Sequence, residues 1–384
     1  MPVVVGGSAM LTSLQLENYR GFMKYRIDGL RQVNLLVGKN GCGKTSILEA
    51  LYLLLTRNKR ATLAEVAMQW RGETANLVGR DGAPANWPPF APSAVHFFHG
   101  HQIRIGDFFH VASEPGRQLG GLRVVAIPPE AVAAPQALQG FLSETGTLPV
   151  LALRFEDTSC GAVGQAPAVF LANTGGVLPW PSQGDEVVGP GADIGSAVCF
   201  LSARHPPGWL KFMWDRVVNL RRSQEVTNAI GILDPRVRDI ARDSSAIYAN
   251  GVPTGFLVDI EGAAQPVPLG TLGDGFRHML FLAIALVQRD GGVMLVDEID
   301  TGLHYSTMGE MWRFVVEAAK RYGVQVFATT HSLDCVRGLA WLCANYPDLG
   351  AEVSLQKIVP SLPEAVAADA KNIVIAAKHD IEMR

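Results

Sequence analysis

Residues 33–51 read VNLLVGKNGCGKTSILEAL, a short apolar run that passes through a glycine-rich loop into a helical pattern. The loop at 38–45, GKNGCGKT, matches G-x-x-x-x-G-K-[ST], the pattern of a phosphate-binding loop between a strand and a helix. Gly38, Gly41 and Gly43 allow the backbone to curl, so that its N–H groups point toward a β-phosphate. The stretch therefore predicts a nucleotide site within an α/β fold.

The polar side chains of this loop have separate expected tasks. Lys44 would reach the β- and γ-phosphates, Thr45 would offer its hydroxyl to Mg²⁺, and the helix that starts here adds its positive N-terminal end. The residues of this segment expected to contact ATP are Gly38, Asn40, Gly41, Cys42, Gly43, Lys44, Thr45 and Ser46. An ordinary glycine-rich turn is the plain alternative, and the flanking strand and helix weigh against it.

Acidic residues follow a second buried strand in GVMLVDEID, residues 292–300. Ligands of open parallel sheets bind at the carboxyl ends of the strands, which places Asp297 and Glu298 at such a site. Asp297 is expected to hold Mg²⁺, and Glu298 to orient and deprotonate the attacking water. His331 follows a third apolar strand, and its tip should lie beside the Glu298 strand, near the γ-phosphate. Helix capping or a core hydrogen bond is the alternative for His331.

The bulk composition describes a core-forming chain. Among its 384 residues, 48% are hydrophobic and 18% are charged, which argues against global disorder. The apolar run MLFLAIALV is well short of the roughly 20 residues that cross a bilayer. Five scattered cysteines without a C-x-x-C pair are expected to be reduced thiols. We therefore expect a cytoplasmic protein without a membrane partner.

Regular α/β order is expected at the two ends of the chain. Apolar strands alternate with helical patterns near the phosphate loop and again after about Phe256, which indicates a parallel sheet covered on both faces. Proline and glycine clusters make the middle less regular. The predicted divisions are a first lobe at 10–110, an irregular insertion with a helical segment at 111–255, and a second lobe at 256–384.

Five segments, taken in order, resemble a known superfamily. They are LQLENYRGF (14–22), NLLVGKNGCGKTSILEAL (34–51), LGDGFRHMLFLAIAL (272–286), MLVDEIDTGLH (294–304) and FATTHS (327–332). Together they resemble the ABC-type ATPase heads of SMC, RecF and OLD proteins, most of all stand-alone bacterial AAA-type ATPases of the OLD kind without a fused TOPRIM domain. The resemblance implies a P-loop head with a mixed β-sheet core flanked by helices, a mid-chain insertion and no long coiled coil.

The resemblance also implies roles for particular residues. Walker A is Gly38 to Thr45, Walker B ends at Asp297, Glu298 is the catalytic base and His331 is the switch histidine. Arg20 matches a basic residue near the nucleotide, with a solvated arginine as its alternative. The signature loop is Leu272 to Phe276, in which Gly273, Asp274 and Gly275 would complete the nucleotide site of a second subunit. Asp300 would face that subunit from the D-loop.

The implied function is an ATP-hydrolysing head that dimerises around two MgATP and changes conformation. On resemblance alone, it would work in anti-phage defence or DNA maintenance with a separate effector, a nuclease or a toxin. One alternative is a regulatory scaffold that binds ATP and turns it over negligibly. Another is the ATPase subunit of a membrane transporter, against which the NYRGF segment and the Gly-Asp-Gly signature weigh.

Two weaker sequence features, the Q-loop candidates and a histidine cluster, have more than one interpretation. Gln69 and Gln102 are candidates for the Q-loop, and neither is convincing. The segment HFFHGHQ offers His96, His99 and His101 as metal ligands or as parts of a polar loop; in an extended strand His99 and His101 would share a face and His96 would oppose them.

Basic residues occur at 57–60 and 216–224. They are expected either to lie on solvated helix faces or to contact the phosphate backbone of DNA or RNA. The formal net charge of −3 gives no global footprint for nucleic acid, so any such contact would come from a local patch. Cys42 is either a small filler of the phosphate loop or a redox brake.

Overall fold

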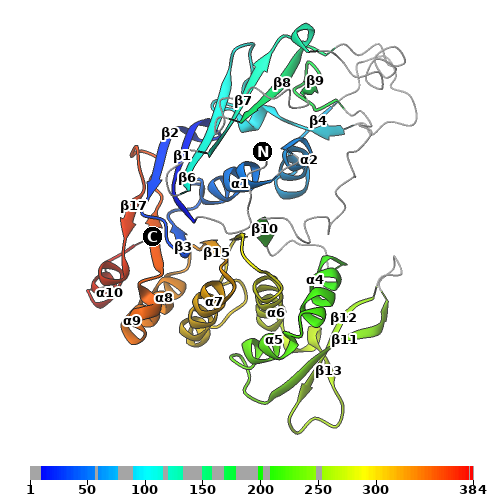
Figure 1. Cartoon of the computed structure of the whole chain (residues 1–384), viewed down its shortest axis with the longest axis vertical. Coiled ribbons are helices and arrows are strands. Elements are labelled where there is room, and N and C mark those ends of the chain that lie inside the picture. The colour runs from blue at the N-terminus through cyan, green and yellow to red at the C-terminus, as the bar shows by residue number, and fades with distance from the viewer. Residues whose placement is uncertain are drawn as a thin grey trace.

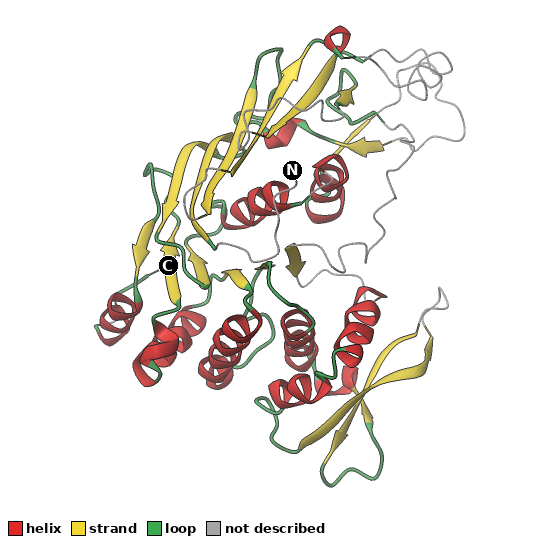
Figure 2. Ribbon diagram, in the orientation of Figure 1, coloured by secondary structure: helices red, strands yellow, loops and turns green. Residues whose placement is uncertain are grey.

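Two six-stranded sheets, a central one and an antiparallel one, enclose helix α1, and a row of helices covers the outer face of the central sheet (Figure 1). The structure is a computed structural model. It describes residues 10–56, 59–76, 90–115, 120–132, 149–157, 168–178, 198–201, 208–247, 253–379 and 381–383. Figure 2 shows the layers as strands, then helices α1 and α2, then strands, then helices.

The central sheet carries the strands that the sequence predicted around the phosphate loop. Its order is β10-β14-β15-β3-β16-β17, parallel from β10 to β16 and antiparallel at β17. The bounds are β3 Val33–Val37, β10 Val198–Leu201, β14 Val293–Val296, β15 Gln325–Thr329, β16 Val353–Lys357 and β17 Val366–Ala368. Every residue of β3, β14 and β15 is buried, because helices or a second sheet lie on both faces.

The second sheet is antiparallel and joins the N-terminal strands to the middle of the chain. Its order is β2-β1-β6-β7-β8-β9. The bounds are β1 Leu11–Tyr19, β2 Phe22–Asp28, β6 Phe108–Pro115, β7 Gly120–Ile127, β8 Leu151–Asp157 and β9 Val169–Leu171. The predicted division between residues 110 and 111 falls inside β6, and β7 to β9, which follow it, continue the same sheet.

The helices form two groups. Between the sheets lie α1 Lys44–Leu55 and α2 Lys59–Glu65, followed by the π-helical turn η1 Val66–Trp70 and the short strands β4 Thr74–Asn76 and β5 Phe90–Pro92. Over the central sheet lie α6 Asp274–Val287, α7 Met308–Tyr322, α8 Leu333–Asn345, α9 Pro347–Gly350 and α10 Ala370–Lys378. Single-turn 3₁₀ helices are η2 Val95–Phe97, η3 Pro129–Ala131, η4 Leu269–Leu272 and η5 Tyr305–Thr307.

A smaller layer extends from α6. It comprises α4 Gly208–Asn219, α5 Ser223–Ile230 and the sheet β11-β12-β13, with bounds Val237–Ile247, Pro253–Ile260 and Val267–Pro268. α4 and α5 are separated at Arg221, which adopts a φ of 57°. The predicted division at 255 and 256 falls inside β12.

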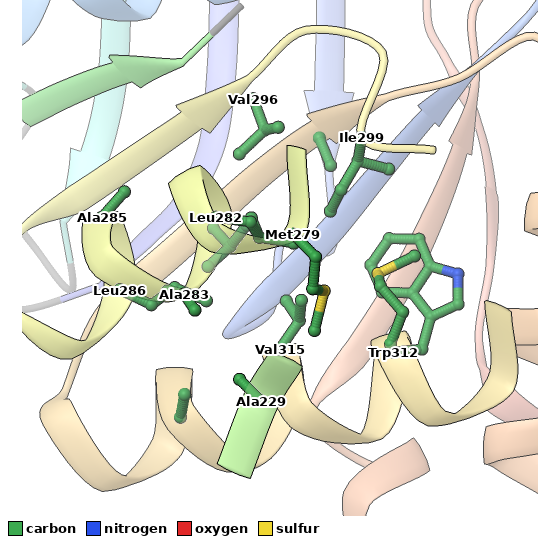
Figure 3. Packing of buried hydrophobic residues seen from close by; sticks show 14 of the residues in the cluster. Ala229, Met279, Leu282, Ala283, Ala285, Leu286, Val296, Ile299, Trp312 and Val315 are labelled. Carbon is green, nitrogen blue, oxygen red and sulfur yellow. The ribbon is translucent and has the colours of Figure 1, made fainter. Parts of the chain in front are cut away.

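The largest apolar cluster lies between the central sheet and its helices (Figure 3). Met279 and Leu282 of α6 and Val315 of α7 are fully buried in it. Trp312 fills the space toward α8, and its indole Nε1 donates to the Cys335 carbonyl at 3.0 Å. This packing fixes α6, whose N-terminus carries the signature loop, against the strands that carry the acidic residues.

The expected fold class is confirmed as a mixed α/β head. Among the described residues the longest helix is α7, with 15 residues, so none of them forms a coiled-coil arm. Within the same residues, every helix is too short or too polar to cross a bilayer.

Candidate active site

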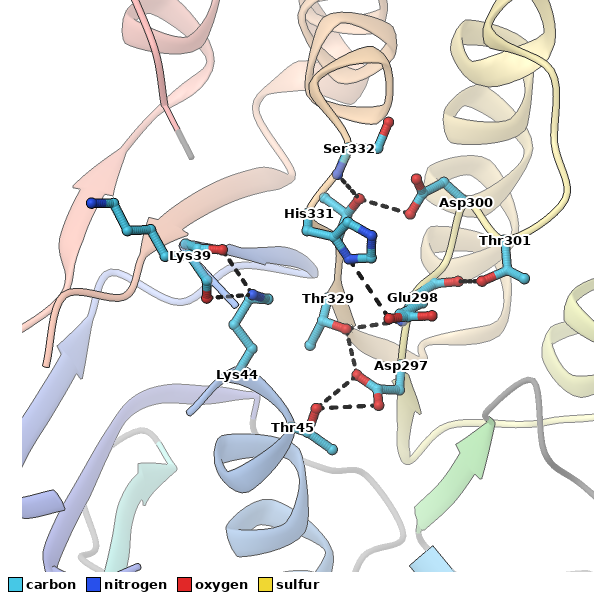
Figure 4. A network of polar contacts seen from close by, with 12 residues as sticks. Lys39, Lys44, Thr45, Asp297, Glu298, Asp300, Thr301, Thr329, His331 and Ser332 are labelled. Carbon is cyan, nitrogen blue, oxygen red and sulfur yellow. Dashed lines mark hydrogen bonds and ion pairs between the residues drawn. The ribbon is translucent and has the colours of Figure 1, made fainter. Parts of the chain in front are cut away.

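The phosphate loop leads directly from β3 into α1. The ammonium group of Lys44 donates to the carbonyl of Gly38 at 2.8 Å and to that of Lys39 at 3.1 Å (Figure 4). Gly38, Gly41 and Gly43 have φ values of 148°, 75° and 96°, in the region that favours glycine. The loop therefore has the curled backbone that the sequence predicted, with Lys44 folded back over it.

Two of these glycines are also needed for space. A Cβ atom on Gly43 would lie 2.5 Å from the ring of Phe22, and one on Gly38 would lie 2.7 Å from the carbonyl oxygen of Ile358. Phe22 ends the NYRGF segment, so that segment contributes a ring that closes on the phosphate loop. Cys42 is buried inside the loop, with its Sγ 3.9 Å from the Lys44 Nζ.

The structure brings Thr45 and Asp297 together from segments far apart in the sequence. The hydroxyl of Thr45 is 3.2 Å from each carboxylate oxygen of Asp297. Thr329, at the end of β15, donates its own hydroxyl to Asp297 at 2.6 Å and so orients the carboxylate. A hydroxyl beside a carboxylate is the oxygen donor set that Mg²⁺ prefers, so these residues fit the predicted ion.

Glu298 is turned out of its strand toward the same edge. Its φ is 56°, uncommon for a residue other than glycine, and its backbone N–H donates to the Thr329 hydroxyl at 2.9 Å. The carboxylate of Glu298 lies 3.6 Å from Nδ1 of His331, and both side chains are about half exposed, at 51% and 56%. β14 and β15 are adjacent and parallel, as the expected position of His331 required.

Asp300 lies at the start of the predicted D-loop and is fixed within its own chain. It accepts a hydrogen bond from the Thr330 hydroxyl at 2.7 Å, and Thr330 in turn accepts from the Ser332 N–H at 2.9 Å. Ser332 caps α8 through the N–H of Cys335. The two threonines of FATTHS thus orient Asp297 and Asp300, a role that the sequence pattern did not reveal.

The structure places Arg20 in a buried cluster of charges. Its guanidinium pairs with Glu49 at 2.6 Å and with Glu73 at 2.7 Å. Glu49 lies on α1, one turn after Thr45, and also pairs with Arg71, which reaches the Ser46 hydroxyl at 3.2 Å. Burial raises the pKa of Glu49, while the two guanidinium groups act in the opposite direction. The predicted contact of Arg20 with nucleotide stays a prediction.

Glu49 and Arg71 were missed by the sequence interpretation, although Glu49 stands inside the quoted KTSILEAL segment. Arg71 follows η1, which contains the Q-loop candidate Gln69. The other candidate, Gln102, accepts from Arg104 at 3.4 Å in an exposed turn. Near Gln69, Arg71 contacts the phosphate-loop helix at Glu49 and Ser46, and the Trp70 ring packs against Tyr52 of the same helix.

The signature loop lies at the start of α6. Gly273 has a φ of 94°, and a Cβ atom built on it would meet nothing within 4 Å. The side chain of Asp274 is 78% exposed and pairs with Arg277 at 2.8 Å. Gly275 has no such space around it, because a Cβ atom built on it would lie 2.5 Å from the carbonyl oxygen of Gly302 in the D-loop.

The helix that follows the signature loop is joined to the D-loop a second time. Nε2 of His278 donates to the Ile299 carbonyl at 2.8 Å. Together with the approach of Gly275 to Gly302, this bond holds the start of α6 against residues 299–302 of the same chain. The signature loop and the Walker B segment therefore form one rigid surface.

Comparison with known proteins supports the nucleotide site from both ends of the chain. Residues 10–86 match a family described as AAA ATPase domain. Residues 219–334 match a family described as AAA domain, putative AbiEii toxin, Type IV TA system.

Two relatives with curated names match this chain to different extents. A DNA replication and repair protein RecF from Exiguobacterium sp. is 30% identical over 143 residues, which are 34% of this chain and 36% of the relative. The match thus spans about a third of the RecF length. An ATP/GTP phosphatase from Helicobacter pylori is 21% identical over 350 residues, covering 85% of this chain and 86% of the relative.

Among solved structures, the SMC head domain from Thermotoga maritima aligns with 94% of this chain and 98% of its own. The TM-score is 0.41 and the identity 13%, too distant to support an argument. The two family matches and the site geometry agree in a nucleotide site of the AAA ATPase type.

Proposed function

We propose that this chain, an ATPase head of the AAA and RecF kind, binds MgATP at the phosphate loop and hydrolyses it within a dimer of two heads. The observation that supports this most strongly is the meeting of Thr45 and Asp297 at 3.2 Å, with Glu298 next in the chain. These residues come from the two matched AAA segments, at 10–86 and 219–334. A nucleotide held by the first segment therefore faces the acids of the second.

Each polar group has a task in this proposal. The loop N–H groups and Lys44 would hold the β- and γ-phosphates, so Lys44 must exchange its two carbonyl partners for phosphate oxygens. Thr45 and Asp297 would hold Mg²⁺, which when bound neutralises charge on the phosphates. Glu298 would take a proton from the attacking water, and His331, 3.6 Å away, would contact the γ-phosphate.

The dimer is inferred from the signature loop. A Cβ atom on Gly273 would meet nothing within 4 Å, and the Asp274 side chain is exposed. His278 of the same helix is hydrogen-bonded to the D-loop of its own chain. A helix N-terminus attracts anions, and here it belongs to a loop that in ABC-type heads completes the site of a second subunit. The dimer would close when ATP binds and open after hydrolysis, so ATP turnover would produce a conformational change.

Phosphate release measures the enzymatic part of the proposal. We expect Glu298→Gln to lower the rate by about 10²- to 10³-fold, because it removes the general base, while ATP binding is retained. A wild-type rate at background, or a variant as fast as the wild type, would instead favour the regulatory scaffold that binds ATP without turnover.

Light scattering measures the dimer. Glu298→Gln protein should shift from monomer to dimer when MgATP is added, because bound nucleotide is no longer consumed. A monomer at micromolar concentration in saturating MgATP would contradict composite sites.

We also propose the kind of cellular process in which this chain acts. The name of the RecF relative and the toxin–antitoxin system in one family description support work in DNA maintenance or anti-phage defence, in the cytoplasm and beside a separate nuclease or toxin effector. DNA or RNA would be bound through local basic residues, since the net charge is −3. Co-purification from the native host, with and without nuclease treatment, tests both kinds of partner.

A further inference from the structure

The turn after η2 holds two imidazole rings close together. His96 lies in η2 and His101 five residues later, and their Nδ1 atoms are 3.3 Å apart with ring centroids at 5.3 Å. The pattern of an extended strand would have put His96 on the face opposite His101. The structure pairs these two instead, because the chain reverses direction between them.

Two residues with a left-handed backbone conformation form the reversal, and buried aromatic side chains anchor it. Gly100 and His101 have φ values of 80° and 57°, and the His101 N–H donates to the Phe98 carbonyl at 3.2 Å. Phe97 and Phe98 are buried and anchor the turn in the core. A left-handed conformation costs a histidine on the order of 1 kcal/mol, so the turn holds His101 beside His96 against a local preference.

The turn is also paired with the end of β1. The Arg20 N–H donates to the Phe97 carbonyl at 3.0 Å, and the His99 N–H donates to the Asn18 carbonyl at 2.9 Å. The ring of His99 bonds through Nδ1 to the Arg20 carbonyl at 2.8 Å, which engages it away from the pair. The backbone around His96 and His101 is therefore ordered before any ligand arrives.

We propose that His96 and His101 bind a divalent transition-metal ion of the zinc class through their two Nδ1 atoms. Neutral imidazole nitrogen is a common ligand of zinc, copper and nickel ions. Two nitrogens that each lie about 2.0–2.1 Å from a tetrahedral zinc ion are about 3.4 Å apart. The observed separation of 3.3 Å matches this spacing without movement of the turn.

Water completes the coordination. Within the part of the chain that the structure describes, no group of three or more histidine, cysteine or acidic side chains is arranged around a metal position. The site is consequently reversible and weaker than a structural zinc site with four protein ligands. Because the ligands must be neutral, protons compete with the metal ion for the two rings.

Isothermal titration of Zn²⁺ into the full-length, nucleotide-free protein tests the proposal. We expect one saturable site whose affinity falls at least tenfold in His96→Ala and in His101→Asn. Asparagine is chosen at 101 because it tolerates a positive φ, so the turn is retained while the imidazole is lost. His99→Gln is the matched control, since it changes an exposed histidine two residues away and should bind like the wild type.

A second readout separates this site from Zn²⁺ bound at the acidic residues of the nucleotide site. Zn²⁺ should slow hydrogen exchange of the amides at 97–101 in the wild type and in His99→Gln, and leave it unchanged in His101→Asn. Equal Zn²⁺ affinity in the wild type, His96→Ala and His101→Asn overturns the proposal, as does a wild type that shows no saturable binding.

Discussion

The phosphate loop and the signature loop are both glycine-rich turns that open a helix, but their surroundings differ. The protein's own atoms close on the first, with the Phe22 ring 2.5 Å from a Cβ built on Gly43 and the Ile358 carbonyl 2.7 Å from one on Gly38. Around Gly273 a Cβ meets nothing within 4 Å, and the Asp274 side chain is 78% exposed. The first loop is complete within one chain, whereas the second faces outward.

This difference separates two kinds of defect. Damage to the phosphate loop and its supports should appear in a single chain, as lost nucleotide binding or lost stability. Damage to the signature loop should spare nucleotide binding and lower the hydrolysis that depends on a second head.

The largest effect is expected from Lys44→Ala. The change removes the ammonium group that would hold the β- and γ-phosphates, so ATP binding and hydrolysis should each fall by about 10²-fold or more. Equilibrium binding of a fluorescent ATP analogue and phosphate release measure the two. A variant that binds like the wild type would show that the loop does not hold the phosphates.

A large loss of stability is expected from Glu49→Gln. Glu49 is fully buried between Arg20 and Arg71, and removal of one partner from a buried ion pair typically costs about 3–5 kcal/mol. Urea denaturation measures the change, with Glu317→Gln, an exposed partner of Arg313, as the control. A loss below about 1 kcal/mol would mean that water or rearrangement replaces the pair.

A more selective effect is expected from Gly273→Glu. The carboxylate would point into open space on its own chain but obstruct the approach of a second head, so hydrolysis should fall by about tenfold or more with ATP binding retained. Gly262→Glu, at another open glycine with a positive φ of 87°, is the control, because it places a glutamate in the same kind of backbone conformation away from the signature loop. Gly275→Glu is less informative, because a Cβ atom at 275 would lie 2.5 Å from the Gly302 carbonyl oxygen within the same chain.

The smallest effect is the pH dependence from His278. Burial lowers the pKa of this ring below its ordinary value of 6.5, so the unfolded chain binds the proton more readily than the folded one. Its contribution to stability is present above pH 6.5 and is lost as the pH falls toward the folded-state value. Thermal melts at pH 7.5 and about 5.5 should differ less in His278→Gln than in the wild type, by at most about 1 kcal/mol. If the stability difference between the two pH values is the same in His278→Gln as in the wild type, groups other than His278 cause it.

The arrangement of the candidate nucleotide site was predictable because its residues stand in short local motifs. The glycine loop, Asp297, Glu298 and His331 all stand at the ends of apolar strands, and parallel pairing brings those ends to one edge. The Thr45–Asp297 contact joins positions 252 residues apart, and the shared edge explains how they meet.

Features that depend on tertiary packing were not predictable. β6 to β8 are regular strands, but proline and glycine between them made the middle look irregular. β6 pairs with β1, β7 with β6 and β8 with β7, and this pairing stabilises them. Glu49 reads as an ordinary polar helix residue until Arg20 and Arg71 are placed around it. The His96–His101 pair depends on the left-handed turn at Gly100.

Mixing two inactive variants tests the composite site most directly. In a dimer of Lys44→Ala with Gly273→Glu, one of the two sites combines an intact phosphate loop from one chain with an intact signature loop from the other. Phosphate release by the mixture should therefore rise well above that of either variant alone. Activity equal to the average of the two separate samples would contradict the claim that each signature loop serves the other chain's nucleotide.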